Sequence, residues 1–260
     1  MKKSSLILSI VILLITVKLS AQSFNATAKY SIKLAEDTFF FDGTLNINDK
    51  ETLFSFKKNK KKKWLRENMQ AFQSQVIYTD ISGYQVYKKI ASKKSLVRAF
   101  CRQKEAIIYE DKIELQWKLG NLEKEIGGLI CRDASVTFRG REYEAWYTLA
   151  VPVSAGPWKF SGLPGLIVSV SDKTGEVAIF LKSLNQTSNE NDIPKIAKGE
   201  KMTIIEFNEC LDKAHTEKYY RNKAIIAKLQ AQAPDIEMSD NNAPKYRINA
   251  TELNFIKKHK

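Results

Sequence analysis

The sequence predicts a mainly β protein of the α+β class: a curved antiparallel β-sheet, either a meander or a half-barrel, with a C-terminal amphipathic helix packed on it. Three observations support this class. Apolar and polar residues alternate in short runs over residues 25–184, turn-forming residues separate those runs, and the apolar spacing becomes helical near residue 203. Short strands joined by tight turns pair with their neighbours in the chain, so the sheet is expected to be antiparallel.

The strand-like runs follow one another with short polar connections. They are NATAKYSIKL (25–34), TFFFDGTLNIN (38–48), TLFSF (52–56), VIYTD (76–80), YQVYKKI (84–90), SLVRAF (95–100), EAIIYE (105–110) and IELQWKL (113–119). Two longer hairpins come next. GLICRDASVTF (128–138) is expected to turn at Arg139-Gly140 into REYEAWYTLAVPV (141–153), and LIVSVSD (166–172) to turn at 173–175 into EVAIFLKSL (176–184).

A single helix is predicted from Thr203 to Gln232. Its apolar stripe consists of Ile204, Phe207, Leu211, Ala214, Ile225, Ile226 and Leu229, and Pro234 ends it. Such a helix is expected to cover the apolar face of the sheet. Residues 235–260 are expected to form an extended tail, and residues 22–260 to form one domain.

The N-terminus is typical of a secretory signal peptide. Lys2 and Lys3 precede an apolar run at 6–17, and small residues follow, so cleavage is expected after Ala21. The run is shorter than the ~20 residues that a membrane-spanning helix needs, and a retained anchor is the alternative. We expect a periplasmic or secreted protein that does not span the membrane once the signal peptide, residues 1–21, is removed.

The charge balance indicates attraction to anions. The chain has 42 basic and 29 acidic residues, a net charge of +13, and loss of the three lysines of the signal peptide would leave +10. Lipid head groups and acidic glycans are candidate partners, whereas nucleic acid is not expected for an exported protein. No cofactor is predicted.

Three cysteines, Cys101, Cys131 and Cys210, allow one disulfide in an oxidising compartment. Cys101 and Cys131 both lie in strand-like runs and form the predicted pair. Cys210 lies on the predicted helix and is expected to pack as a small apolar side chain. The sequence has no C-x-x-C motif, which argues against thioredoxin-type chemistry.

The stretch GPWKFSGLPGLI at 156–167 has the densest turn signals. Structural turns are predicted at Gly156, Pro157, Gly162, Pro164 and Gly165, with Pro164-Gly165 as a type II turn that needs a positive φ at Gly165. Trp158 and Phe160 are expected on one face of an extended strand. The stretch could be a bend, a ligand-lining loop or a catalytic loop, and Ser161 has no neighbouring His.

GLPGLI at 162–167 is the hexapeptide after which the GLPGLI family of exported Bacteroidetes-type proteins is named. The chain resembles that family over about residues 117–184, and YRINATEL (246–253) resembles its C-terminal signature without the usual proline. Matching residues are Gly128, Cys131, Arg132, Ala134, Gly140, Arg141, Ala145, Trp146, Tyr147, Thr148, Pro152, Gly156, Pro157, Phe160 and Asp172. The resemblance implies a β-rich exported domain and no particular activity.

Two candidate binding surfaces emerge. One is an apolar groove for a lipid or peptide, lined by Tyr147, Trp158, Phe160, Leu163 and Leu166; the alternative is ordinary core. The other is an anion-docking tip, and the alternative is a solvated loop. Its residues are Lys57, Lys58, Lys60, Lys61, Lys62 and Lys63.

No catalytic or metal site is predicted. Glu142 and Glu144 share a strand face and, with Asp172, are the only candidates for carboxylate catalysis. Asp212 and His215 are one helical turn apart, but two ligands do not make a metal site.

We therefore expect an exported, non-enzymatic, envelope-associated protein that binds an apolar ligand, a peptide or a partner protein. A secreted hydrolase that uses carboxylates and a structural subunit of an outer-membrane assembly are the alternatives.

Overall fold

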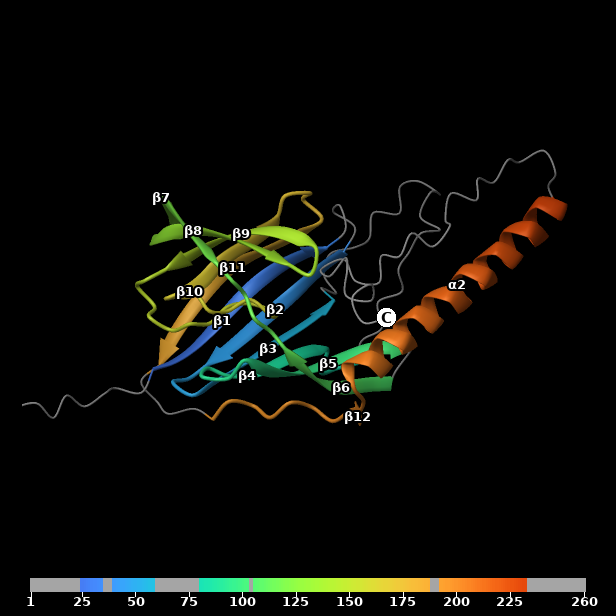
Figure 1. The fold of residues 1–260 in the computed structure, drawn as a ribbon, viewed down its shortest axis with the longest axis horizontal. Helices are drawn as coiled ribbons and strands as arrows, with labels where there is room; N and C mark the ends of the chain where they lie inside the picture. The colour runs from blue at the N-terminus through green and yellow to red at the C-terminus, as the bar shows by residue number, and fades with distance from the viewer. Residues whose placement is uncertain (1–23, 35–38, 59–79, 103–104, 188–191, 233–260) are drawn as a thin grey trace, which may run out of the picture.

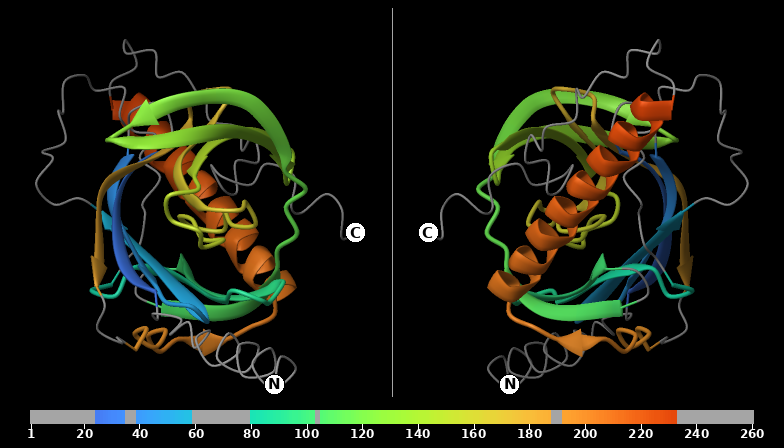
Figure 2. Two further views of the ribbon diagram at one scale, coloured as in Figure 1. Left: turned by 90° about the vertical axis from the view of Figure 1, so that its left-hand side faces the viewer. Right: turned by 90° about the vertical axis from the view of Figure 1, so that its right-hand side faces the viewer.

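The computed structural model describes residues 24–34, 39–58, 80–102, 105–187 and 192–232. These residues form a mostly β architecture: a 12-stranded open mixed sheet and one C-terminal helix, α2 (Ile204–Gln232). Figure 1 shows the sheet as a curved body from which α2 projects, and Figure 2 shows the strands curling around an interior. The predicted mainly β class is therefore confirmed.

Most strands lie close to the predicted runs. The strand bounds are β1 (Asn25–Leu34), β2 (Phe39–Ile47), β3 (Glu51–Lys58), β4 (Tyr84–Lys89), β5 (Lys94–Arg102), β6 (Glu105–Lys112), β7 (Lys118–Ile126), β8 (Leu129–Phe138), β9 (Arg141–Thr148), β10 (Leu166–Asp172), β11 (Val177–Thr187) and β12 (Glu200–Lys201). Strand β12 and the part of β7 after residue 119 were not predicted. The run VIYTD lies outside the described residues, except Asp80.

Two meanders join side by side to make the sheet. The strand order is β12-β6-β5-β4-β3-β2-β1-β11-β10-β9-β8-β7, so the first strand pairs with both β2 and β11. Alternate residues of β1, including Ala28, Tyr30 and Ile32, are buried, because a strand directs successive side chains to opposite faces. The buried side chains line the concave face of the curved sheet.

Most strand pairs are antiparallel, as predicted, but the edge strand β12 pairs with β6 in parallel. The two strands are far apart in the chain and are not joined by a tight turn, so the antiparallel pairing expected of neighbouring strands does not apply to β12. The hairpin between β8 and β9 does match its prediction. Arg139 (φ 47°) and Gly140 (φ 84°) both have a positive φ, which is the conformation of a type I′ turn.

The predicted strand over 113–119 is wrong at residues 113–117. Residues 113–117 connect β6 to β7 and cross between the two ends of the sheet, as Figure 2 shows, and β7 begins at Lys118. Ile113 is buried, and Leu115 and Trp117 pack against the core. The alternating pattern therefore reflects inward-facing side chains on a crossing segment rather than a paired strand.

Helix α2 begins where the sequence predicts, at a capping box. The Glu206 backbone N–H donates to Thr203 Oγ1 (3.2 Å), and the Thr203 N–H donates to Glu206 Oε2 (2.7 Å). The helix does not cover the sheet, which corrects the expectation. Its first turns contact β5 and β6, where Phe207 is buried and stacks on Tyr109 at 4.7 Å.

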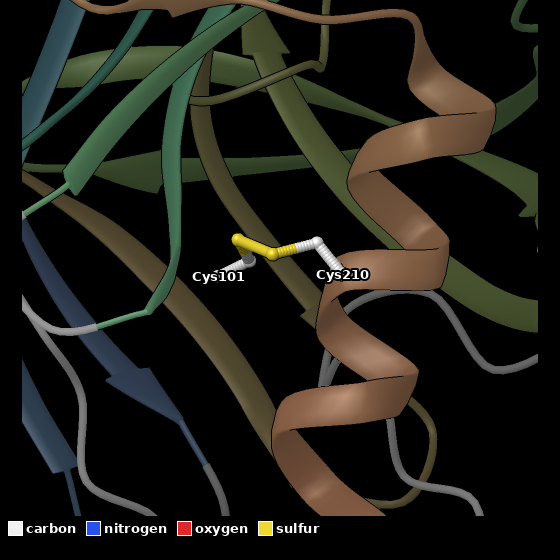
Figure 3. Close-up of a disulfide and its surroundings, with 2 residues drawn as sticks. All are labelled: Cys101 and Cys210. Atoms are coloured by element: carbon white, nitrogen blue, oxygen red, sulfur yellow. A yellow bond between two sulfur atoms is a disulfide. The ribbon is translucent and has the colours of Figure 1, made fainter.

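A disulfide joins Cys101 of β5 to Cys210 of α2, with 5.8 Å between their Cα atoms (Figure 3). The predicted Cys101–Cys131 pair and the predicted apolar role of Cys210 are therefore wrong. Cys131 is a buried free thiol on β8, near the opposite end of the strand order from β5. Cys101 faces the concave side, where the first turns of α2 lie.

Candidate functional site

The interior of the curved sheet is occupied by the segment from 149 to 165, here called the inner loop. Figure 2 shows it inside the ring of strands, between β9 and β10. Its buried backbone finds specific partners: the Ile167 N–H donates to the Ala155 carbonyl (2.9 Å), and Trp117 Nε1 donates to the Ser161 carbonyl (2.9 Å). Buried backbone groups need such partners, so this loop is an integral part of the core.

The turns of the inner loop differ in detail from the prediction. Trp158 (φ 53°) and Gly162 (φ 101°) have a positive φ, whereas Gly165 does not. A Cβ at Gly165 would lie 2.0 Å from the Thr148 carbonyl oxygen, so glycine is required there for close backbone approach rather than for a type II turn.

The predicted extended strand around Trp158 and Phe160 is also wrong. The Phe160 N–H donates to the Pro157 carbonyl (3.1 Å) and closes a tight turn through Trp158. Gly156 lies against this turn, where a Cβ would meet the Phe160 carbonyl oxygen at 2.7 Å. The turn directs Phe160 into the core.

Phe160 is the centre of an aromatic cluster. Its ring lies 4.8 Å from Tyr143, 5.4 Å from Trp158, 6.3 Å from Trp117 and 6.4 Å from Phe138. Most of these contacts are edge-on or tilted, which aromatic pairs favour. The cluster fills the space between the inner loop, β8 and β9.

The five residues predicted to line an apolar groove lie in two places. Tyr147, Leu163 and Leu166 are buried in the core. Trp158 and Phe160 belong to the aromatic cluster and also border a small cleft, described below. Ligand binding by these side chains stays a prediction.

A row of polar side chains crosses the concave face beside the apolar core. Sheet register places Thr52 of β3 opposite Lys88 of β4, Lys88 opposite Ser95 of β5, and Ser95 opposite Asp111 of β6. Residues directly opposite on antiparallel strands share a face. Thr52, Ser95 and Asp111 are buried and Lys88 is half-buried, so four neighbouring strands bring these groups together.

At one end of this row, Asp111 forms a buried charge cluster. Its carboxylate accepts from Arg139 Nη2 (2.5 Å) and pairs with Lys159 Nζ of the inner loop (2.7 Å). Burial by itself raises the pKa of Asp111, but the two cations outweigh that effect and hold it below its usual range. The cluster fixes the inner loop to β6.

In the middle of the row, Lys88 Nζ donates to Ser161 Oγ of the inner loop at 2.5 Å. No described carboxylate pairs with this ammonium, and burial lowers its pKa. A small cleft opens here between β3, β4, β5 and the inner loop. Its lining residues are Thr52, Val86, Lys88, Ile90, Ser95, Ser154, Gly156, Trp158, Lys159, Phe160 and Ser161. We call it the polar cleft.

The polar cleft encloses about 10 Å³, which is room for about one water-sized group. A serine hydroxyl beside a lysine of lowered pKa is also the arrangement of a serine–lysine nucleophile. Ser161 is only 8% exposed, so a substrate carbonyl could reach it only if the inner loop moved. The geometry therefore favours binding a small polar group over acyl transfer.

The sequence prediction missed the residues of this cleft apart from Trp158 and Phe160. A signal was present, because Lys88 follows Tyr84 and Val86 at alternate positions, and Asp111 follows Ile107 and Tyr109. Extending each alternation by one step places a polar side chain on the core face. A charge at a core-face position is itself a marker of a specialised site.

The carboxylates considered for catalysis occupy different settings. Glu142 is exposed on the convex face and pairs with Lys173 (2.6 Å), whose hydrogen bond and charge lower its pKa. Glu144 is also exposed. Asp172 is buried and pairs with Arg141. A general acid needs a raised pKa, and Glu142 has the opposite shift.

The remaining candidates add no chemistry. Lys57 is exposed on β3, and Lys60, Lys61, Lys62 and Lys63 lie outside the described residues, as does the Lys58 side chain. His215 lies on α2, but its side chain is not described. Within the described ranges, no group of three or more His, Cys, Asp or Glu side chains could hold a metal ion. No helix among these residues is long and apolar enough to span a membrane.

The comparisons with known proteins concern the same region and the fold. Residues 138–169, from the end of β8 into β10, match the model of Porph_ging, described as a protein of unknown function. No protein of curated function matches this chain. The match includes the whole inner loop.

Two structures of PNGF-II, in space groups P21 and C2, have a similar fold. Their TM-scores are 0.52 and 0.51, each at 15% identity over 74% of this chain. The matched region spans only 34% and 33% of the PNGF-II chains, about a third of their length. At this identity the likeness concerns the fold alone.

Proposed function

We propose that this protein is an exported, non-enzymatic member of the GLPGLI family that acts in the cell envelope by binding a ligand or partner chain at the polar cleft. The observation that carries the proposal is the cleft itself, in which the half-buried Lys88 ammonium has no described carboxylate partner. A charge held this way costs stability. Proteins retain such costly groups where they serve binding or catalysis.

Export is supported by two independent features. The first 21 residues have the composition of a signal peptide. The Cys101–Cys210 disulfide fits an oxidising compartment, because cytosolic thiols are normally kept reduced.

Membership of the GLPGLI family is supported by the hexapeptide at 162–167. That hexapeptide overlaps the region matched by the Porph_ging model. In the fold the hexapeptide ends the inner loop and begins β10, and it directly follows Ser161 of the cleft.

The test is expression of residues 1–260 in a Gram-negative host, purification from the envelope fraction, and native mass spectrometry. We expect a chain that begins at Gln22, contains one disulfide and carries a bound species that Lys88→Met loses. Lys89→Met is the matched control, because Lys89 is exposed on the opposite face of β4. An uncleaved cytoplasmic chain, or protein that is always empty, would contradict the proposal.

A second candidate function, a serine–lysine hydrolase, is favoured by the 2.5 Å contact between Lys88 Nζ and Ser161 Oγ. It predicts that a fluorophosphonate probe labels wild-type protein and fails to label Ser161→Ala. The binding proposal predicts no labelling of either protein. The carboxylate alternative predicts that wild-type protein has hydrolase activity and that Glu142→Gln or Glu144→Gln loses it. Unchanged activity in both variants, or no activity in the wild type, contradicts it.

A further inference from the structure

We propose that the polar cleft is a carboxylate-binding site in which Lys88, Ser95 and Thr52 hold one oxygen of an incoming carboxylate. This inference deepens the proposed function and rests on it, because it names the chemical class that the same cleft binds. The ligand would be an organic acid or a chain end whose carboxylate enters the cleft while its carbon skeleton stays outside.

The charges around the cleft favour an anion. Lys88 and Lys159 are the charged lining residues, and no acidic side chain lines the cleft among the residues that the structure describes. Asp111 lies directly opposite Ser95 on β6, but its carboxylate is already engaged by Lys159 and Arg139. Among the described residues no carboxylate pairs with Lys88, so an added anion would supply a partner for its charge.

Lys88 and Lys159 show the difference between a structural and an available lysine. Lys159 is buried and pairs with Asp111 at 2.7 Å. Lys88 is half-buried and lines the cleft, and its hydrogen bond goes to a neutral serine hydroxyl. Burial lowers the pKa of Lys88 without an opposing charge. A bound carboxylate would supply the missing charge.

Ser95 gives an independent indication. It is 2% exposed and lines the cleft, and its Oγ makes no hydrogen bond with any described residue. A buried hydroxyl without a partner costs ~1–3 kcal/mol. Because Ser95 lies directly opposite Lys88 in the sheet, one oxygen placed between them could accept from both side chains.

The size of the cleft selects among anions. About 10 Å³ admits one oxygen of a carboxylate presented edge-on, whereas a tetrahedral phosphate or sulfate would need space for several oxygens. Half-buried Trp158 and Ile90 also line the cleft and offer apolar surface to a carbon skeleton. This combination of an apolar rim and a few polar groups is typical of small-molecule sites.

The experiment is an NMR titration of the oxidised, ¹⁵N-labelled mature chain in chloride-free buffer. Acetate is the probe, and acetamide is its neutral counterpart of similar shape. We expect saturable shifts of the Lys88, Ser95 and Ser161 amide signals with acetate at millimolar concentration, the range expected for so small a ligand. Acetamide should produce no saturable shifts.

Three variants test the assignment. Lys88→Met should weaken acetate binding at least about tenfold, and Ser95→Ala about threefold, because hydrogen bonds to charged groups are the stronger ones. Lys89→Met should bind like the wild type. Lys88→Gln provides a second variant if the spectrum of Lys88→Met shows that it has not folded.

Each other outcome is decisive. Equal binding of acetate and acetamide, or unchanged acetate binding in the folded Lys88 variants, overturns the inference. Chloride that binds more tightly than acetate makes the cleft a halide site and also overturns it. Decanoate compared with decanol, and a peptide with a free C-terminus compared with its amide, then separate the two sources of carboxylate.

Failure of this inference and failure of the proposed function can be told apart. A neutral species that co-purifies and is lost in Lys88→Met, together with no acetate binding, refutes the carboxylate and retains the binding function. Acetate binding by a chain that stays uncleaved in the cytoplasm retains the carboxylate site and refutes the proposed function in the cell envelope.

Discussion

The inner loop and helix α2 both reach the concave face of the sheet, but they are held there in opposite ways. The inner loop has no regular secondary structure, yet Ala155, Phe160 and Leu163 are at most 2% exposed. The helix is a regular element of 29 residues, and among its described side chains Phe207 is the one buried hydrophobic side chain. Tyr220, further along it, is 64% exposed.

This difference follows from backbone hydrogen bonding. A helix satisfies its own N–H and C=O groups, so α2 can project from the sheet, as Figure 1 shows, with one disulfide and two turns of contact. An irregular segment can be buried only if the surrounding structure supplies partners. For the inner loop, the Leu166 and Ile167 N–H groups of β10 donate to its carbonyls, and Trp117 Nε1 donates to another.

The largest expected effect tests the charge cluster that fixes the inner loop. Asp111→Asn should lower the free energy of unfolding by about 3–5 kcal/mol, because it leaves Lys159 and Arg139 as cations without their shared carboxylate. Denaturant unfolding measures the change. The control is Asp42→Asn, which breaks an exposed pair with Lys182 and should cost within about 1 kcal/mol. Equal effects would refute the importance of the cluster.

The same carboxylate predicts the acid response. The pKa of Asp111 is lowered in the folded state, so its contribution is complete above the unfolded pKa of about 4 and is lost as the pH falls through the folded value. The Asp111→Asn variant has no carboxylate at this position to be protonated. Its free energy of unfolding should therefore decline less between about pH 5 and about pH 2 than that of the wild type.

The next effect tests the close packing of the inner loop. Gly165→Ala should cost about 3 kcal/mol or more, because its Cβ would collide with the Thr148 carbonyl and the buried backbone must shift. Thermal unfolding followed by circular dichroism measures this cost. Gly175→Ala is the matched control: its φ is +74° but no atom lies within 4 Å of the added Cβ, so we expect about 1 kcal/mol. A smaller loss at Gly165 than at Gly175 would contradict the model of the loop.

The smallest effect concerns the helix. Cys210→Ser should lower the stability of the attachment of α2 by about 2 kcal/mol. Hydrogen exchange should accelerate in residues 204–232 and stay slow in the inner loop and β10. Reduced wild-type protein should behave in the same way. Equal acceleration in the sheet would mean that the helix and sheet unfold together.

Local patterns predicted much of the fold. The runs at 25–34 and 166–172 coincide with β1 and β10, the Arg139-Gly140 turn lies where predicted, and α2 begins where the helical spacing of apolar residues begins. Each depends on residues only a few positions apart. The failure at 113–117 has the same origin, because an alternating pattern reports which side chains face inward and not whether the backbone is paired.

The candidate site depended on longer distances. Alternation alone could place Lys88, Ser95 and Asp111 on core-facing positions, but their meeting in one row requires the register of β4, β5 and β6. The disulfide was mispredicted because Cys101 and Cys131 share a strand-like setting, whereas proximity to Cys210 arises from where α2 meets the sheet.

Residues near one another in the chain were thus enough to define the strands, tight turns and capped helix of this protein, since those features rest on backbone geometry and short-range bonding. The pairing of β1 with β11, the entry of the inner loop into the core and the assembly of the polar cleft came from curvature and register. Curvature and register bring together residues that are far apart in the chain, such as Asn25 and Thr187. No local pattern encodes contacts over such a sequence separation.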